Sequence, residues 1–218
     1  MIRDHDSRLA AKEEVSPGIW HLTFECPEIA SAALPGNFVL IKPARGSAPL
    51  LRRPLGVLDA DAAKGTIEVL FRVVGQGTDL IAGGDVGQVF SVRGPVGGNF
   101  KDFRHGSVWA VAGTLGIAPL LFLRKKIGGF EKLFLGVGNA SWAPFAEWVQ
   151  KRAPEMTLYS DDGSIGRKYA ERAAQQRRCS AGRLDEHEVA RLRGLGDRRT
   201  LERHVPDAGR HFLLCGEA

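Results

Sequence analysis

The chain has 218 residues, of which 44% are hydrophobic, and it carries a formal net charge of +5 with an isoelectric point near 9.3. This length and apolar content suffice for one large domain or for two of ordinary size. The positive charge permits anionic partners such as dinucleotides or acidic proteins, but it is no evidence for nucleic-acid binding, and we predict no nucleic-acid partner.

The three cysteines, Cys26, Cys179 and Cys215, lie far apart in the sequence. Because no C-x-x-C pair exists, local spacing predicts neither a zinc site, nor an iron–sulfur site, nor a disulfide framework. Residues 1–10 are charged and lack the apolar core of a secretory signal. No apolar run has the length of a membrane span. We therefore expect no metal site, no membrane span and a cytoplasmic location.

Two domains follow from a change of pattern near residue 103. Before it, short strand-like runs alternate with turns, which predicts an antiparallel β-barrel over residues 1–103. After it, apolar strands alternate with helices, which predicts an α/β domain with an open parallel sheet over residues 104–218. The expected strands are 19–24, 38–41, 66–73, 108–112, 132–137, 157–160 and 211–214, and the expected helices are 119–126 and 143–152.

The α/β pattern becomes atypical from about residue 165. Residues 165–203 contain eleven Lys or Arg against six Asp or Glu, with one aromatic residue, Tyr169. This composition indicates a helix-rich basic surface, either simply solvated or in contact with a partner. With so few aromatic rings, base stacking on nucleic acid is not supported.

The barrel half contains two candidate phosphate contacts. The Arg53 guanidinium can form paired charge-assisted hydrogen bonds with a pyrophosphate, and Pro54 stiffens the strand that presents it. The alternative is an ordinary surface arginine. Gly77 and Thr78 lie where a strand leads into a helix, a setting that suits an anionic phosphate, although a simple strand-to-helix turn has the same sequence.

The α/β half contains candidate nucleotide contacts. Gly113, Gly116 and Pro119 follow an apolar strand and precede a helix, as a dinucleotide-binding loop does. Asp161 and Asp162 follow a later strand, where they could accept hydrogen bonds from ribose hydroxyls or simply form an Asp-Gly turn. Cys215 ends another apolar strand, either beside a nicotinamide or as a small buried residue.

Five segments, in order, resemble one known family. They are Leu-Arg-Arg-Pro-Leu at 51–55, Arg-Val-Val-Gly-Gln-Gly-Thr at 72–78, Gly-Pro-Val-Gly-Gly-Asn-Phe at 94–100, Gly-Ile-Ala-Pro-Leu at 116–120 and Ser-Asp-Asp-Gly-Ser at 160–164. Together they closely resemble the electron-transfer subunit of type B dihydroorotate dehydrogenase, a member of the ferredoxin–NADP reductase superfamily. The resemblance covers about residues 10–165 and resumes at 212–216.

The resemblance implies FAD on the barrel, NAD(H) on the α/β domain, and a [2Fe-2S] cluster that passes electrons to the FMN of a catalytic partner subunit. It places FAD against a first group of residues and the nicotinamide nucleotide along a second, with Cys215 as the candidate catalytic residue. The FAD group is Arg53, Pro54, Leu55, Gly56, Leu70, Phe71, Arg72, Gly77 and Thr78. The nucleotide group is Gly113, Thr114, Gly116, Pro119, Asp161 and Asp162.

The sequence also departs from the family. Gly56 replaces a usual serine whose hydroxyl faces the flavin ring, Ala112 and Thr114 occupy usual glycine positions, and Glu217 replaces a proline. The four cluster cysteines are absent, so we expect either a truncated product or a relative without the cluster.

We therefore predict a flavoprotein electron-transfer subunit that moves electrons between NAD(H) and a dihydroorotate dehydrogenase-like partner through FAD, in pyrimidine biosynthesis. Hydride would pass between nicotinamide and flavin, which requires stacking and orientation more than an acid–base residue. The alternatives are an NAD(P)H:acceptor reductase subunit of another cytoplasmic redox complex and a non-catalytic remnant that binds a partner.

Overall fold

The computed structural model describes residues 3–44, 49–100, 107–168, 201–205 and 210–215. The chain divides into two compact units. One comprises residues 1–101 together with 118–126, and the other comprises residues 102–117 together with 127–218.

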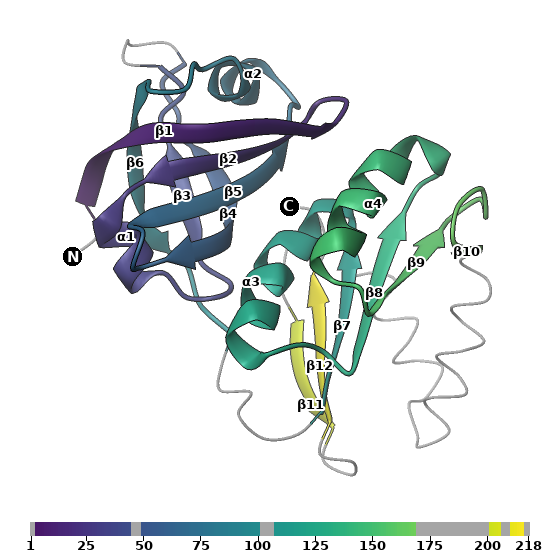
Figure 1. Ribbon diagram of the computed structural model, residues 1–218. Coiled ribbons are helices and arrows are strands. Elements are labelled where there is room, and N and C mark those ends of the chain that lie inside the picture. Colours follow the sequence, from purple (N-terminus) through teal and green to yellow (C-terminus); the bar gives the residue numbers. More distant parts are fainter. Residues whose placement is uncertain (1–2, 45–48, 101–106, 169–200, 206–209, 216–218) are drawn as a thin grey trace. The chain divides into compact units, whose positions relative to one another are not determined.

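The N-terminal unit is built around a closed six-stranded antiparallel barrel with strand order β1-β2-β5-β4-β3-β6 (Figure 1). Its elements are β1 (Arg3–Ser16), β2 (Ile19–Glu25), α1 (Pro27–Ala32), β3 (Phe38–Ile41), β4 (Arg53–Asp61), β5 (Thr66–Arg72), α2 (Gln76–Ala82) and β6 (Val89–Val96). Closure leaves no unpaired strand edge in the sheet.

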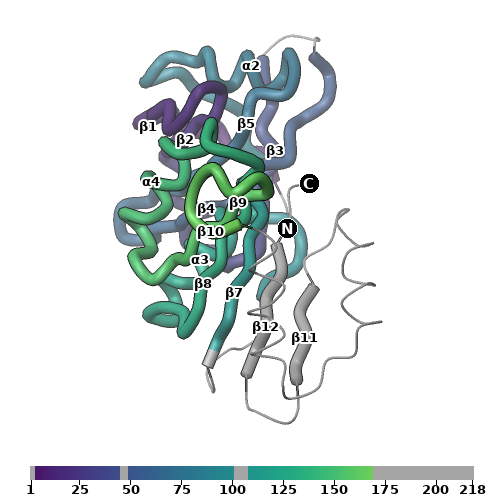
Figure 2. The backbone as a smooth tube through the Cα atoms, turned by 90° about the vertical axis from the view of Figure 1, so that its right-hand side faces the viewer, coloured from purple at the N-terminus to yellow at the C-terminus, as the bar shows by residue number. Residues whose placement is uncertain are grey.

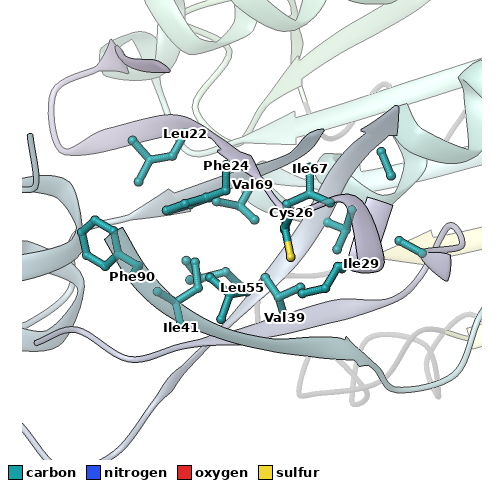
Figure 3. Packing of buried hydrophobic residues seen from close by; sticks show 14 of the residues in the cluster. Leu22, Phe24, Cys26, Ile29, Val39, Ile41, Leu55, Ile67, Val69 and Phe90 are labelled. Atoms are coloured by element: carbon teal, nitrogen blue, oxygen red, sulfur yellow. The ribbon is translucent and has the colours of Figure 1, made fainter. Parts of the chain in front are cut away.

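The barrel core forms because alternate residues of each strand point inward. Leu22 and Phe24 of β2 pair with Val69 and Ile67 of β5, and all four side chains are fully buried. Phe24 also meets Phe90 of β6 edge to face, with ring centroids 5.7 Å apart. Figure 3 shows these side chains gathered in one cluster with Cys26 among them.

The second unit contains a six-stranded sheet with order β10-β9-β8-β7-β12-β11. Strands β7, β8, β9, β10 and β12 run parallel, and β11 pairs antiparallel with β12. Figure 2 shows β7 and β8 running alongside each other. The elements that follow β6 in the chain are β7 (Ser107–Gly113), η1 (Thr114–Gly116), α3 (Ile117–Ile127), β8 (Lys132–Val137), η2 (Ala140–Trp142), α4 (Ala143–Arg152), β9 (Met156–Ser160), β10 (Arg167–Lys168), β11 (Leu201–Val205) and β12 (Arg210–Cys215). Of these, residues 118–126 of α3 belong to the N-terminal unit.

The predicted fold class, a barrel followed by a parallel α/β sheet, is confirmed. The strands and helices expected from the sequence did not include β1, α1 or β6, and β4 was expected only as the strand that presents Arg53. The first strand has many charged residues, yet Ser7 and Leu9 alternate inward and are fully buried. The predicted basic surface falls mostly on residues 169–200, outside the described residues.

Within the described part of the chain, no helix combines the length and apolar character needed to span a membrane.

Candidate functional site

The two candidate phosphate contacts of the barrel lie against each other. A Cβ atom added to Gly77 would lie 2.1 Å from Nε and 2.6 Å from Cζ of Arg53. The guanidinium therefore rests directly on the backbone of Gly77, in the first turn of α2, although the two residues come from different elements. Only glycine leaves room for this packing.

Two adjacent arginines have different roles at the start of β4. Arg52 donates to the Ser91 carbonyl at 2.8 Å and to the Ser91 hydroxyl at 3.0 Å, and it pairs with Asp4 at 2.9 Å. Among the described residues, Arg53 donates a hydrogen bond to the Leu51 carbonyl at 3.1 Å, and its side chain is only half-buried. Arg52 thus ties barrel strands together, whereas Arg53 has N–H groups to offer to a phosphate.

The hydroxyl of Thr78 makes its hydrogen bonds within the turn that begins α2. It accepts from the backbone N–H of Val74 at 2.9 Å and of Gly75 at 3.2 Å, and donates to the Gly75 carbonyl at 2.9 Å. The side chain is almost fully buried. Thr78 therefore holds the turn that carries Gly77, rather than presenting a free hydroxyl.

A residue that the sequence did not single out fixes the other end of α2. The Lys12 ammonium donates to the carbonyls of Ala82 at 3.0 Å and Gly84 at 2.9 Å, and lies 5.0 Å from the Trp20 ring centroid. A cation at a helix C-terminus stabilises the free carbonyls there. Because seventy residues separate Lys12 from Ala82, no local pattern signals this contact.

The remaining candidate FAD residues line β4 and β5. Leu55, Leu70 and Phe71 expose 6%, 4% and 4% of their surface, so a ligand would meet them mainly through backbone atoms. Pro54 is exposed, and Gly56 and Arg72 are half-buried. A Cβ at Gly56 would find no atom within 4 Å, so open space lies next to this glycine.

The candidate dinucleotide loop contains a strained residue. Thr114 follows Gly113 with φ of +42°, the one non-glycine residue with positive φ among the described residues. This region disfavours β-branched side chains and costs of order 1–3 kcal/mol. Glycine is therefore the residue that the backbone geometry favours here. Gly116 ends the short η1 helix and is buried, and Pro119 lies in the first turn of α3.

The two aspartates lie in the exposed turn after β9. Asp162 accepts from the backbone N–H of Ser164 at 2.9 Å and from its hydroxyl at 2.6 Å. These hydrogen bonds from Ser164 lower the pKa of the Asp162 carboxyl. Asp161 is anchored by its backbone N–H, which lies 3.1 Å from the Val137 carbonyl, while its side chain is exposed. Of the two carboxylates, that of Asp162 is thus engaged within its own turn, while that of Asp161 faces solvent.

The sheet brings the α/β candidates to one edge. Gly113 pairs with Gly136, Val137 pairs with Ser160, and Cys215 pairs with Ala112 in parallel register. The carboxyl ends of these parallel strands, which carry Gly113, Asp161 and Cys215, therefore lie along the same edge. Ligands of open α/β sheets bind at this edge.

Residues 6–101 match the family described as the oxidoreductase FAD-binding domain. The chain is 34% identical over 173 residues to the electron transfer subunit of dihydroorotate dehydrogenase B (NAD(+)) from Desulforamulus reducens, covering 77% of this chain and 66% of the relative. The corresponding subunit of Clostridium acetobutylicum is 35% identical over 135 residues, covering 62% of this chain and 53% of the relative. The chain thus spans between about half and about two thirds of the length of these relatives.

Solved structures share the fold at lower identity. The structure of an NADH-dependent reduced ferredoxin-NADP oxidoreductase, described in the context of flavin-based electron bifurcation, superposes with a TM-score of 0.67 at 23% identity, over 78% of this chain and 62% of that one. The cytochrome b5 reductase domain of Ulva prolifera nitrate reductase superposes with a TM-score of 0.64 at 17% identity, over 99% of this chain and 87% of that one.

Proposed function

Since the chain belongs to the family of the electron-transfer subunits of dihydroorotate dehydrogenase B, we propose that it is a flavoprotein that binds FAD on its barrel and NAD(H) on its α/β domain. In this role it takes electrons from NADH, or returns them to NAD⁺, on behalf of a catalytic partner subunit of the dihydroorotate dehydrogenase type. A cytoplasmic location is part of the same proposal.

The packing of Arg53 on Gly77 is the observation that carries the proposal. The residues of the barrel fit FAD: a cation lies directly over the backbone of a glycine-containing turn, and open space lies beside Gly56 and Gly75. Arg53 would hold the pyrophosphate, and the backbone from Pro54 to Gly56 would face the ring system. When bound, FAD supplies the capacity to accept a hydride from a nicotinamide and release the electrons singly.

The α/β edge would orient the nicotinamide nucleotide. Gly113 to Gly116 would approach the pyrophosphate, the Asp161 carboxylate would accept from a ribose hydroxyl, and Cys215 would lie next to the nicotinamide. The part of these residues is positioning, which is the main contribution a protein makes to such a transfer. The strain at Thr114 supports weaker nucleotide binding than a glycine at that position would give.

The [2Fe-2S] cluster of the resemblance does not fit this chain. Such a cluster takes four protein ligands, usually thiolates, and the chain has three cysteines, of which Cys26 is buried in the barrel core. We therefore assign no cluster ligand among these 218 residues, and we expect these residues by themselves to pass electrons inefficiently to a dihydroorotate dehydrogenase partner.

The experiment is anaerobic stopped-flow mixing of the FAD-loaded protein with NADH. We expect the flavin absorbance to bleach. Addition of a catalytic subunit with orotate should then yield little dihydroorotate. A flavin that stays oxidised contradicts the proposed function, and brisk NADH-dependent orotate reduction contradicts the expected inefficiency.

A second candidate is an NAD(P)H:acceptor reductase subunit of another redox complex whose acceptor takes electrons directly from flavin. Flavin bleaching with NADH, together with rapid reduction of such an acceptor but not of orotate, would distinguish it. A protein that binds no flavin at all would instead indicate a non-catalytic, partner-binding chain.

A further inference from the structure

Three potential metal ligands meet at the end of the barrel where β1 begins. His5, Cys26 and Glu28 each offer one ligand atom, and these atoms all lie within 4.8 Å of one another. The His5 Nδ1 atom is 3.8 Å from Oε2 of Glu28. No local spacing signals this group, because a β-hairpin separates His5 from the other two.

Regular secondary structure positions all three residues. His5 lies in β1, where it pairs with Val92 of β6. Cys26 follows β2 directly, caps α1, and donates its backbone N–H to the Gly65 carbonyl at 2.8 Å. Glu28 lies in the first turn of α1. The backbones of all three residues are therefore held in place by the barrel strands and by α1.

The burial of the three groups is graded from the core to the surface. Cys26 is 1% exposed and packs beside Ile29 and Val39 in the core cluster (Figure 3). The His5 side chain is 20% exposed and the Glu28 side chain 66% exposed. Of the three groups, the Glu28 carboxylate thus lies outermost and the Cys26 sulfur innermost.

We propose that His5, Cys26 and Glu28 bind one Zn²⁺ ion, with water in the fourth position. A thiolate, an imidazole and a carboxylate are all established zinc ligands, whereas a thiolate is a poor ligand for Mg²⁺ or Ca²⁺. Tetrahedral zinc places its ligand atoms about 3.4–3.7 Å apart. The separation of 3.8 Å between His5 and Glu28 is close to this value.

The charge balance of the site suits its partly apolar surroundings. One thiolate and one carboxylate together cancel the two positive charges of the ion, with the imidazole neutral. The Cys26 thiol releases one proton to solvent when the sulfur–zinc bond forms.

The bound ion would join the N-terminal end of β1 to the start of α1. Its expected consequence is higher thermal stability, because a ligand that binds only the native state stabilises it by mass action. The role is separate from flavin binding and does not depend on the proposed function.

The test is zinc binding to the full chain, measured as metal content after dialysis and as affinity in competition with a chromophoric chelator. We expect one Zn²⁺ per chain and a higher melting temperature. His5→Gln and Cys26→Ser should each weaken binding by about 100-fold or more, because loss of even an outer partner costs 10–100-fold. Glu28→Gln should weaken it to a lesser degree, since the amide oxygen can still bind.

Two controls make the result specific. His21→Gln removes another histidine that contacts carboxylates, with its Nε2 2.8 Å from Glu68, and Cys179→Ser removes another thiol. Both should bind zinc as the parent does. Cobalt in place of zinc should give a thiolate-to-metal absorption, read as a difference spectrum against the flavin, that Cys26→Ser abolishes. His5→Gln keeps the test valid if Cys26→Ser fails to fold.

Absence of stoichiometric zinc from the parent, or equal affinity in the parent and in His5→Gln, would overturn the proposal. A loss of binding in Cys179→Ser that matches the loss in Cys26→Ser would also overturn it, because the ion would then be held elsewhere.

Discussion

The candidate flavin residues of the barrel and the candidate nucleotide residues of the α/β domain differ in how far other residues already hold them in position. In the barrel, Arg53 already lies on Gly77, and Thr78 and Lys12 hold the helix that carries the glycine. In the α/β domain, Thr114 occupies a left-handed conformation, and Asp162 is engaged with Ser164 in its own turn. The comparison suggests a preorganised flavin site and a weaker nucleotide site.

The largest expected effect separates the two neighbouring arginines. Arg53→Ala should weaken FAD binding by roughly tenfold to a hundredfold, because a lost charge-assisted contact costs about 1.5–3 kcal/mol. Arg52→Ala should instead lower the free energy of unfolding by about 1 kcal/mol, because it removes the hydrogen bonds to Ser91, whereas Asp4 keeps its ion pair with Arg93. FAD titration and denaturant unfolding of both variants measure this. Equal FAD affinity and equal stability of the two variants would contradict the different roles of the two arginines.

The next effect concerns the strained residue of the nucleotide loop. Thr114→Gly should raise the free energy of unfolding by about 1 kcal/mol and tighten NADH binding, because glycine adopts positive φ without a steric cost. Thr114→Ala keeps the left-handed strain and should gain less. Thermal unfolding and NADH titration test both variants. Weaker NADH binding in Thr114→Gly would show that the threonine side chain itself contributes.

A smaller effect is expected from restoring a hydroxyl to the flavin side. Gly56→Ser should leave stability within about 0.5 kcal/mol of the parent, since its Cβ enters open space. The serine hydroxyl should add one hydrogen bond to the flavin, worth about 1 kcal/mol. If this bond forms as the flavin is reduced, flavin reduction should become several-fold faster. Gly84→Ser adds the same atoms 2.5 Å from the Phe90 ring and should destabilise the barrel. Equal destabilisation by both would contradict the open space at Gly56.

The smallest effect is expected in the exposed turn that follows β9. The pKa of Asp162 is lowered by its hydrogen bonds from Ser164. Any stability they contribute is therefore present above the ordinary pKa of an aspartate and is lost as the pH falls through the lowered value. NMR titration of the carboxyl should give a pKa below 3.8 in the parent, and a higher pKa in Ser164→Ala. Equal values would mean that Ser164 does not hold the carboxylate.

The sequence predicts most of this architecture because its strands show clear periodicity. The runs at 19–24 and 66–73 alternate apolar and polar residues, and their inward members pair in the core. β1 is not predicted in this way because charged residues surround the buried Ser7 and Leu9. The sequence alone does not distinguish the roles of Arg52 and Arg53, because Ser91 and Gly77, which they contact, lie far away in the chain. His5 and Cys26 likewise come together only through barrel closure.

The central claim is that Arg53 on Gly77 forms the flavin site, and a double-mutant cycle of FAD affinity tests it most directly. In Gly77→Ala the new methyl group would displace the guanidinium, so FAD binding should weaken roughly tenfold to a hundredfold, as in Arg53→Ala. The double variant should bind no more weakly than Arg53→Ala alone, because both changes remove the same interaction. Fully additive losses, or a Gly77→Ala variant that binds FAD like the parent, would contradict the account.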